Sequence, residues 1–162
     1  MKVALFIGRF QPLHKGHLHA IKEAMKKYEV ILAVGSVNKR NLENPFSFEE
    51  RKEMIRRAGI KCNVIGVKDF TDDKKWRDNL LKRVSFDLVI SGSKWVKDCF
   101  KDVKKVIQPS FLKKYKYNGS YIRKKILERK EWKSLVPKEV AEYLLEINGE
   151  ERIRKLAGKN RA

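Results

Sequence analysis

Two histidines near the start of the chain have the types and spacing that suit phosphate binding. His14 and His17 are separated by Lys15 and Gly16, and apolar residues at helical spacing follow directly. The first turn of a helix exposes unpaired backbone N–H groups and carries the positive end of the helix dipole. Gly16 allows a ligand to approach the backbone closely, while Arg9 and Lys15 can donate from their side chains. The sequence therefore predicts an anion site built for a polyphosphate.

The segments around these histidines predict a strand, a turn and a helix. Residues 3–7 form a continuous apolar run that is bounded by charge and by Gly8, as is typical of a buried strand. Pro12 disfavours the helical conformation of the preceding residue, which predicts a turn. A second apolar run, residues 30–36, follows the helix. Apolar strands without alternation, joined through a helix, favour a parallel sheet that is covered on both faces.

Three further apolar runs predict the rest of the sheet. They lie at residues 62–67, 86–92 and 103–108, and helical patterns separate them. Five short strands with intervening helices indicate a single-domain α/β protein, with a doubly wound, Rossmann-like parallel sheet and C-terminal helices. Ligands of such sheets lie beyond the carboxyl ends of the strands. We expect the domain to span residues 1–157 and to end in a flexible basic tail, residues 158–162.

A capping box predicts the start of another helix that carries a candidate site residue. Ser47 and Glu50 have the required spacing, and Gly59 predicts the end of the helix. Arg51 lies in the apolar stripe of this helix, where a guanidinium costs free energy unless it meets an anion. The alternative is an arginine at the rim of the stripe, with its charged head in water.

The segment from residue 101 to residue 133 is strongly basic. It holds twelve basic and three acidic residues, a local net charge of +9. Residues 118–120 can cap a helix whose first turns carry Ser120 and Arg123. Because tyrosines are interleaved with the lysines, a surface for nucleic acid is a second interpretation. Binding of a phosphate substrate and a lysine-rich composition already explain the charge, so this interpretation is the weaker one.

Several of these segments resemble known motifs. Residues 14–17 match the HxGH motif of the nucleotidyltransferase superfamily, and Gly8-Arg9-Phe10-Gln11-Pro12 resembles the archaeal-type nicotinamide mononucleotide adenylyltransferases. Residues 44–54 are similar to the NPFxxxERxxM segment of that family. Residues 118–123 look like its second phosphate motif, written SGTEIR in relatives. The resemblance implies joining of ATP and nicotinamide mononucleotide to give NAD and pyrophosphate, with Mg²⁺ bound together with ATP and no protein metal site. Archaeal relatives form hexamers, so the resemblance also implies a homo-oligomer.

The resemblance also implies roles for individual residues. The catalytic residues would be His14, His17 and Arg9, with Lys15 at the rim. The ATP-binding residues would be Gly8, Arg9, Phe10, His14, Gly16, His17, Arg51, Ser120, Ile122 and Arg123. The mononucleotide-binding residues would be Trp76, Asp73 and Ser93.

The residues for the second substrate depart from the family pattern. Trp76 has two interpretations, a core residue or a ring that stacks on nicotinamide. Asp73 and Ser93 stand where the family has asparagine. These differences leave room for a sister nucleotidyltransferase that acts on another phosphate ester, such as a flavin or pantetheine precursor.

Composition narrows the class of protein further. The chain has 162 residues and a formal net charge of +19, which points to anionic partners or to a lysine-rich source proteome. Cys62 and Cys99 lack the spacing of a metal site or a disulfide framework, and we expect two free thiols. The apolar runs are too short for a membrane span. We therefore expect a soluble, cytoplasmic protein with no membrane partner.

Overall fold

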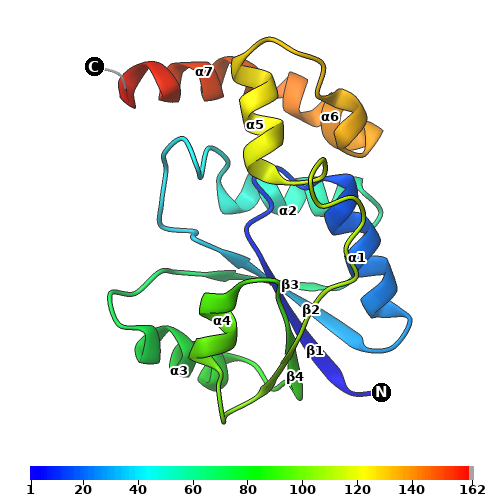
Figure 1. Cartoon of the computed structure of the whole chain (residues 1–162), viewed down its shortest axis with the longest axis vertical. Coiled ribbons are helices and arrows are strands. Elements are labelled where there is room, and N and C mark those ends of the chain that lie inside the picture. Colours follow the sequence, from blue (N-terminus) through cyan, green and yellow to red (C-terminus); the bar gives the residue numbers. More distant parts are fainter. Residues whose placement is uncertain (161–162) are drawn as a thin grey trace. The chain divides into compact units, whose positions relative to one another are not determined.

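Strands and helices alternate up to the fifth strand in the computed structural model, which describes residues 1–160, and only helices follow that strand within those residues (Figure 1). The strands are β1 (Val3–Gly8), β2 (Glu29–Gly35), β3 (Asn63–Val67), β4 (Leu88–Ile90) and β5 (Lys105–Ile107). The helices are α1 (Lys15–Met25), α2 (Phe48–Arg57), α3 (Asp73–Arg83), α4 (Lys94–Cys99), α5 (Gly119–Leu127), α6 (Lys138–Glu146) and α7 (Gly149–Asn160), with a 3-10 turn at Lys133–Leu135. None of the helices in residues 1–160 is long and apolar enough to cross a membrane.

The five strands form one parallel sheet in the order β3-β2-β1-β4-β5. Leu5 on β1 lies opposite Ile31 on β2 and opposite Val89 on β4. The chain therefore winds outward from β1 in both directions, and the strand order reverses between β1 and β4. This arrangement confirms the predicted doubly wound, Rossmann-like sheet.

The chain divides into two compact units whose segments interleave along the sequence. The sheet unit consists of residues 1–8, 20–38 and 62–110. The helical unit consists of residues 9–19, residues 39–61 and the chain from Phe111 onward. The predicted tail at residues 158–162 overlaps α7, which continues to Asn160. Residues 161 and 162 lie outside the described part of the chain, so the domain boundary stays a prediction.

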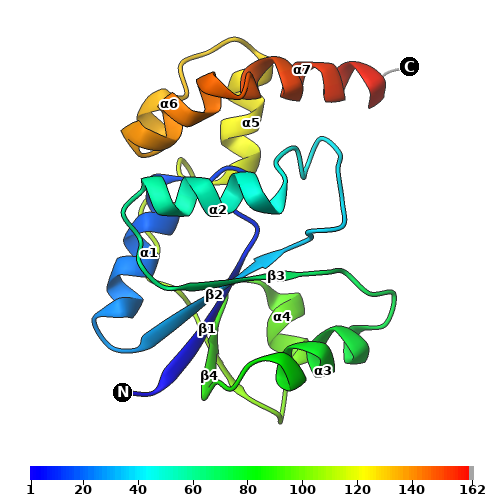
Figure 2. The same cartoon turned by 180° about the vertical axis from the view of Figure 1, so that it is seen from behind.

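The sheet unit buries apolar side chains on both faces of the sheet. On one face, Leu5 and Ala33 pack with Trp76 and Leu80 of α3 and with Phe100, which ends α4. The two views of the chain show α3 and α4 side by side on this face, and α1 on the other (Figures 1 and 2). Strands that are buried on both faces have continuous apolar sequences, and this is why β1 and β2 could be predicted from the sequence. Cys62 and Cys99 are free cysteines of this unit.

The helical unit is a cluster in which α5 packs on α7, and α6 packs on both α2 and α7. The capping box at the start of α2 is present, since Ser47 and Glu50 each accept from the other residue's backbone N–H. The Glu50 carboxylate also accepts two hydrogen bonds from Arg152 of α7, one of them 2.8 Å long. Arg152 thereby ties α7 to the first turn of α2.

Candidate active site

The turn that follows β1 has an unusual backbone for its residue types. Phe10 has a φ of 53°, in the left-handed region that non-glycine residues rarely adopt, and its side chain is fully buried. Its ring meets the edge of the His17 ring, with 4.6 Å between the ring centroids. Such conformations persist where the surrounding structure holds them, and they cluster at functional sites.

Three long-range contacts hold this turn in the helical unit. Arg51 Nη1 donates to the carbonyl oxygen of Arg9 at 2.9 Å, and Arg123 Nη1 donates to that of Gln11 at 2.7 Å. The Gln11 side chain donates to the Phe46 carbonyl at 3.0 Å and accepts from the Phe46 N–H at 2.9 Å. The predicted ATP-binding residues Arg9, Phe10, Arg51 and Arg123 are thus brought together. Sequence reasoning missed the bridging role of Gln11, which is 2% exposed.

His14 and His17 form a stacked pair at the start of α1. Their ring centroids lie 3.6 Å apart, with 20° between the ring planes. The backbone N–H of each residue donates to Nδ1 of the other, at 3.2 Å in both cases. Because each Nδ1 accepts a hydrogen bond, the neutral rings carry their proton on Nε2. Both imidazoles therefore keep an Nε2–H that can donate to a ligand oxygen.

Burial keeps this pair neutral. It lowers the pKa of His14 to about 4. Burial also lowers the pKa of His17 well below its ordinary value, and the neighbouring His14 lowers it further. Desolvation disfavours the charged form of an imidazole, and a like charge beside it adds to the effect. Near neutral pH the two rings can therefore stack closely without charge repulsion.

The depressed pKa of His14 predicts that stability is lost in acid. The pKa is about 4 in the folded protein and has its ordinary value of 6.5 when unfolded. Between these pH values the unfolded chain binds a proton that the folded chain does not. The free energy of unfolding is therefore highest above pH 6.5 and falls as the pH drops toward 4. The loss amounts to at most about 3 kcal/mol.

Urea unfolding across this pH range measures the effect. In a His14→Asn variant the amide oxygen can accept from the His17 N–H but does not titrate, so the variant should lose less stability in acid. His19→Asn, on the same helix but outside the stacked pair, is the matched control and should follow the wild type. An identical pH dependence in the wild type and His14→Asn would contradict the assignment.

Three arginines converge around the same turn. Burial and, to a smaller extent, the charge of Arg9 lower the pKa of Arg51 to about 10, while Glu50 opposes the shift. Burial also lowers the pKa of Arg123; Glu43 opposes this shift, and Arg9 adds to it. Arg51 is completely buried, so the alternative that placed its head in water is wrong. Guanidinium groups repel one another strongly in a desolvated place. An anion that binds between them offsets this repulsion and stabilises the arrangement.

The first turn of α5 lies against the histidine turn within the helical unit. Asn118 caps the helix by accepting from the Tyr121 N–H at 2.7 Å, and the exposed Ser120 hydroxyl accepts from Arg123 at 3.4 Å. A Cβ on Gly119 would lie 3.3 Å from the Gln11 carbonyl oxygen, so the backbones approach closely here. Ile122, a predicted ATP-binding residue, has a side chain that is buried in the core.

Gly16 is a second position of close approach. A Cβ there would lie 2.9 Å from Cε1 of His14 and 2.9 Å from Cβ of Tyr117. Any larger residue would therefore displace the His14 ring or the chain that precedes α5. Lys15, predicted at the rim, is exposed. Gly8 ends β1 in the sheet unit.

The predicted mononucleotide residues all belong to the sheet unit. Trp76 is 4% exposed and packs in the core, as one of its two interpretations predicted. Asp73 is the exposed first residue of α3, while Asp72 caps that helix. The Ser93 hydroxyl caps α4 by accepting from the Val96 N–H at 3.3 Å. Sequence reasoning missed an exposed indole beside them, that of Trp95.

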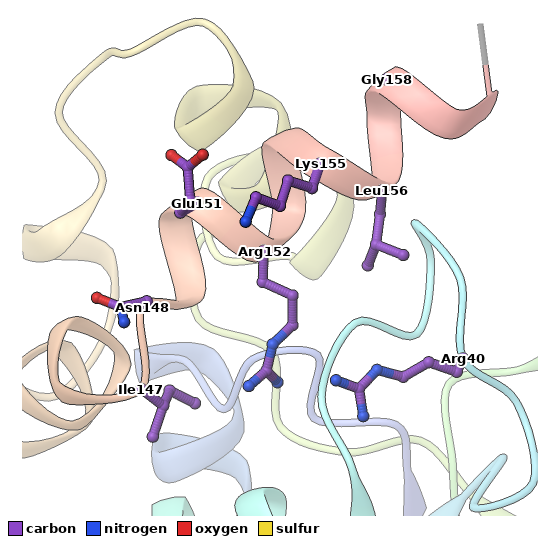
Figure 3. Close-up of a pocket in the computed structure, with 8 residues that line it drawn as sticks. All are labelled: Arg40, Ile147, Asn148, Glu151, Arg152, Lys155, Leu156 and Gly158. Atoms are coloured by element: carbon purple, nitrogen blue, oxygen red, sulfur yellow. The ribbon is translucent and has the colours of Figure 1, made fainter. Parts of the chain in front are cut away.

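A separate hollow of about 1200 Å³ lies in the helical unit (Figure 3). Its lining residues are Arg40, Ile147, Asn148, Glu151, Arg152, Lys155, Leu156 and Gly158. None of them belongs to the predicted site. Arg152, which points into the hollow, is engaged by Glu50 and by the Pro45 carbonyl.

Comparisons with known proteins agree with this fold. The cytidylyltransferase-like family model matches residues 5–144, so the chain is a nucleotidyltransferase of that class. It is 39% identical to the nicotinamide-nucleotide adenylyltransferase of Pyrococcus furiosus, over 97% of this chain and 90% of that protein. It is 38% identical to that of Methanococcus aeolicus, over 97% and 96%. The chain belongs to the nicotinamide-nucleotide adenylyltransferase family, which confirms the resemblance seen in the motifs.

A solved structure supports the same family assignment. It is a bifunctional NMN adenylyltransferase/ADP ribose pyrophosphatase from Francisella tularensis, complexed with AMP and a manganese ion. The two chains superpose with a TM-score of 0.80 at 28% identity, over 99% of this chain. This chain spans about half, 53%, of the length of that bifunctional protein.

Proposed function

We propose that this protein joins ATP and nicotinamide mononucleotide to give NAD and pyrophosphate. The observation that carries the proposal is the convergence of hydrogen-bond donors on one turn of the helical unit. Two neutral imidazoles with free Nε2–H groups lie on a turn that Arg51 and Arg123 hold, and the charge of Arg9 acts on both arginines. A triphosphate supplies the acceptors and the negative charge that such a set of donors requires.

The reaction is a direct transfer at phosphorus. A phosphate oxygen of the mononucleotide attacks the α-phosphorus of ATP and forms the new P–O bond. The bond between the α-phosphorus and the oxygen that bridges to the β-phosphate breaks, and pyrophosphate leaves with the electron pair. No side chain becomes covalently bound. The protein supplies alignment, together with stabilisation of the charge that develops on the α-phosphate and on the leaving group.

Each donor has a place in this scheme. His17 and His14 donate from Nε2 to the α- and β-phosphates. Arg9, Arg51 and Arg123 bind the triphosphate, with the Ser120 hydroxyl and the free N–H groups at the start of α5 beside them. Arg51 and Arg123 each donate a hydrogen bond to a backbone carbonyl. A guanidinium has five N–H groups, more than Arg123 uses in its contacts with the Gln11 carbonyl and the Ser120 hydroxyl, so donors of Arg123 remain for phosphate. Lys15 lies at the rim.

Mg²⁺ is the metal that we expect to enter with the nucleotide. The site residues of the helical unit are cationic or neutral donors, and Mg²⁺ requires oxygen ligands. Within residues 1–160, no group of three or more His, Cys, Asp or Glu side chains is placed to hold a metal ion. The chemistry of the donors therefore fits an ion that is held by ATP phosphates, which would neutralise charge on the leaving pyrophosphate.

The second substrate carries a positively charged pyridine ring. Asp73 is exposed at the start of α3 and favours a cationic ring, whereas it would repel the added carboxylate of nicotinic acid mononucleotide. We therefore expect a higher kcat/KM for nicotinamide mononucleotide than for the acid form, and a smaller preference in an Asp73→Asn variant. Equal kcat/KM for the two mononucleotides in the wild type would contradict this assignment.

A panel of mononucleotides tests the proposed function. The protein is incubated with ATP, Mg²⁺ and each mononucleotide in turn, and the dinucleotide that forms is identified by mass. We expect NAD from nicotinamide mononucleotide. Turnover only with a flavin or pantetheine precursor would assign the chain to a sister activity.

We further propose that the protein is cytoplasmic and forms a homo-oligomer, a hexamer by resemblance to archaeal relatives. Light scattering would test the oligomeric state.

A further inference from the structure

The hollow in the helical unit lies between two segments that are far apart in the sequence (Figure 3). One wall is α7 with residues 147 and 148 before it, and the other is the loop that carries Arg40. Both walls belong to the helical unit, so the hollow lies within one compact unit. Its volume of about 1200 Å³ is large enough for a small-molecule ligand. The candidate active site shares none of its lining residues and does not explain it.

Basic side chains converge on this hollow. Figure 3 shows the guanidinium groups of Arg40 and Arg152 extending toward each other, while the carboxylate of Glu151 points away from them. Lys155 lines the same hollow, one helical turn after Arg152 on α7. Within the described part of the chain, the side chains of Arg40 and Lys155 make no ion pair and no hydrogen bond. Their charges are therefore not paired with a protein carboxylate and are available to an anion.

Arg152 is held in place and still has unused N–H groups. Its Nη1 donates to Glu50 and to the Pro45 carbonyl, and its Nη2 donates to the second Glu50 oxygen at 2.8 Å. A guanidinium has five N–H groups, so the Nε–H and one N–H of Nη2 remain. The Arg152 guanidinium also lies over the Phe46 ring, 5.7 Å from its centroid. Because these contacts fix the guanidinium before a ligand binds, less conformational entropy is lost on binding.

The remaining lining residues narrow the class of ligand. Ile147 and Leu156 place aliphatic surface beside the basic groups, and such surface packs against the organic part of a ligand. Three basic side chains from two segments match an anion that carries several charges and several acceptor oxygens. A chain of two or more phosphates has both, and arginine binds phosphate through parallel hydrogen bonds.

We propose that this hollow is a second, non-catalytic binding site, for a ligand that carries a diphosphate or a longer phosphate chain. The phosphates bind between Arg40 and Arg152 with Lys155 beside them, and an organic group attached to the phosphates packs on Ile147 and Leu156. The proposal does not rest on the proposed function, because none of these residues takes part in the adenylyl transfer.

Calorimetric titration with inorganic pyrophosphate tests the proposal. We expect the wild type to bind two pyrophosphates per chain, one in the hollow and one at the candidate active site. Arg40→Gln should weaken the hollow component roughly ten-fold or more, because a charge-assisted hydrogen bond is lost, and Lys155→Gln should weaken it less. Arg123→Gln should weaken only the other component. Arg40 and Lys155 are exposed, so their variants should melt at the wild-type temperature.

Lys61→Gln is the matched control. Lys61 is an exposed lysine of the same unit that does not line the hollow, and its replacement removes one positive charge. We expect both binding components to stay as in the wild type. An effect as large as that of Arg40→Gln would mean that the anion responds only to the overall charge, and would contradict a site in the hollow.

Two further results would overturn the proposal. One is pyrophosphate binding that neither Arg40→Gln nor Lys155→Gln changes. The other is a change of mass by light scattering in these two variants without any change in pyrophosphate binding, which would identify the hollow as a contact between copies of the chain. A component that Arg40→Gln removes would support the site even if the wild type makes no dinucleotide.

ADP distinguishes the two sources of a diphosphate, a nucleotide and an inorganic phosphate chain. It is titrated into Arg123→Gln, in which the candidate active site is weakened. Tighter binding of ADP than of pyrophosphate, reduced in an added Leu156→Ala substitution, would identify a nucleotide as the ligand. Equal or weaker binding of ADP would identify an inorganic phosphate chain. Both results support a diphosphate site, whereas binding of neither ligand to Arg123→Gln would refute it.

Discussion

Replacing His17 with alanine is expected to lower kcat by roughly 10²–10³-fold, with a smaller change in KM for ATP. The Nε2–H of His17 donates to charge that develops mainly in the transition state, so its loss affects the chemical step more than the binding of ATP. Steady-state kinetics with saturating mononucleotide measure both constants.

A second variant separates this effect from damage to the turn. His17 Nδ1 accepts from the His14 N–H, so alanine also leaves that N–H without a partner. His17→Asn can restore the acceptor but places no donor at the position of Nε2. We expect it to lose nearly as much kcat as His17→Ala while keeping more stability. A His17→Ala enzyme with wild-type kcat would mean that the phosphate site lies elsewhere.

Replacing Arg51 with lysine is expected to weaken ATP binding by about 1–3 kcal/mol. Arg51 is completely buried, and its guanidinium donates to the carbonyls of Arg9 and Ser47. A lysine has the charge but not the planar fork, so it cannot hold these carbonyls and also donate two parallel hydrogen bonds to phosphate. Calorimetric titration with ATP measures the loss, and thermal unfolding reports any accompanying change in stability.

The control for Arg51 is an exposed arginine on the same helix. Arg56 bonds to Glu53 at the surface, so Arg56→Lys should leave ATP affinity and melting temperature close to those of the wild type. If Arg51→Lys lowers the melting temperature but its folded fraction binds ATP normally, Arg51 only supports the turn.

Local patterns predicted the elements of the fold because single segments determine them. The apolar run of β1 is long enough to be recognised alone, and Ser47 and Glu50 form their capping box within one helical turn. The period of α2 also placed Arg51 in the interior, where it is found. Each of these features depends on residues that are close together in the sequence.

The contacts that shape the site could not be predicted in the same way, because they join distant segments. The Gln11 amide pairs with the Phe46 backbone 35 residues away, and Arg123 reaches a carbonyl 112 residues away. His14 and His17 each accept a hydrogen bond from the other's backbone N–H, and these bonds depend on how the two rings stack. The exposure of Trp95 depends on the packing of α4 against α3, to which no periodicity in a six-residue helix points.

ATP that is labelled at the α-phosphorus tests the central claim most directly. The label is followed with nicotinamide mononucleotide and Mg²⁺ present, and the products are separated. We expect the label to appear in NAD in a one-to-one ratio with the pyrophosphate released, with unlabelled pyrophosphate and no label on the protein. Label in pyrophosphate, label bound to the protein, or release of pyrophosphate without a labelled dinucleotide would contradict direct adenylyl transfer at this site.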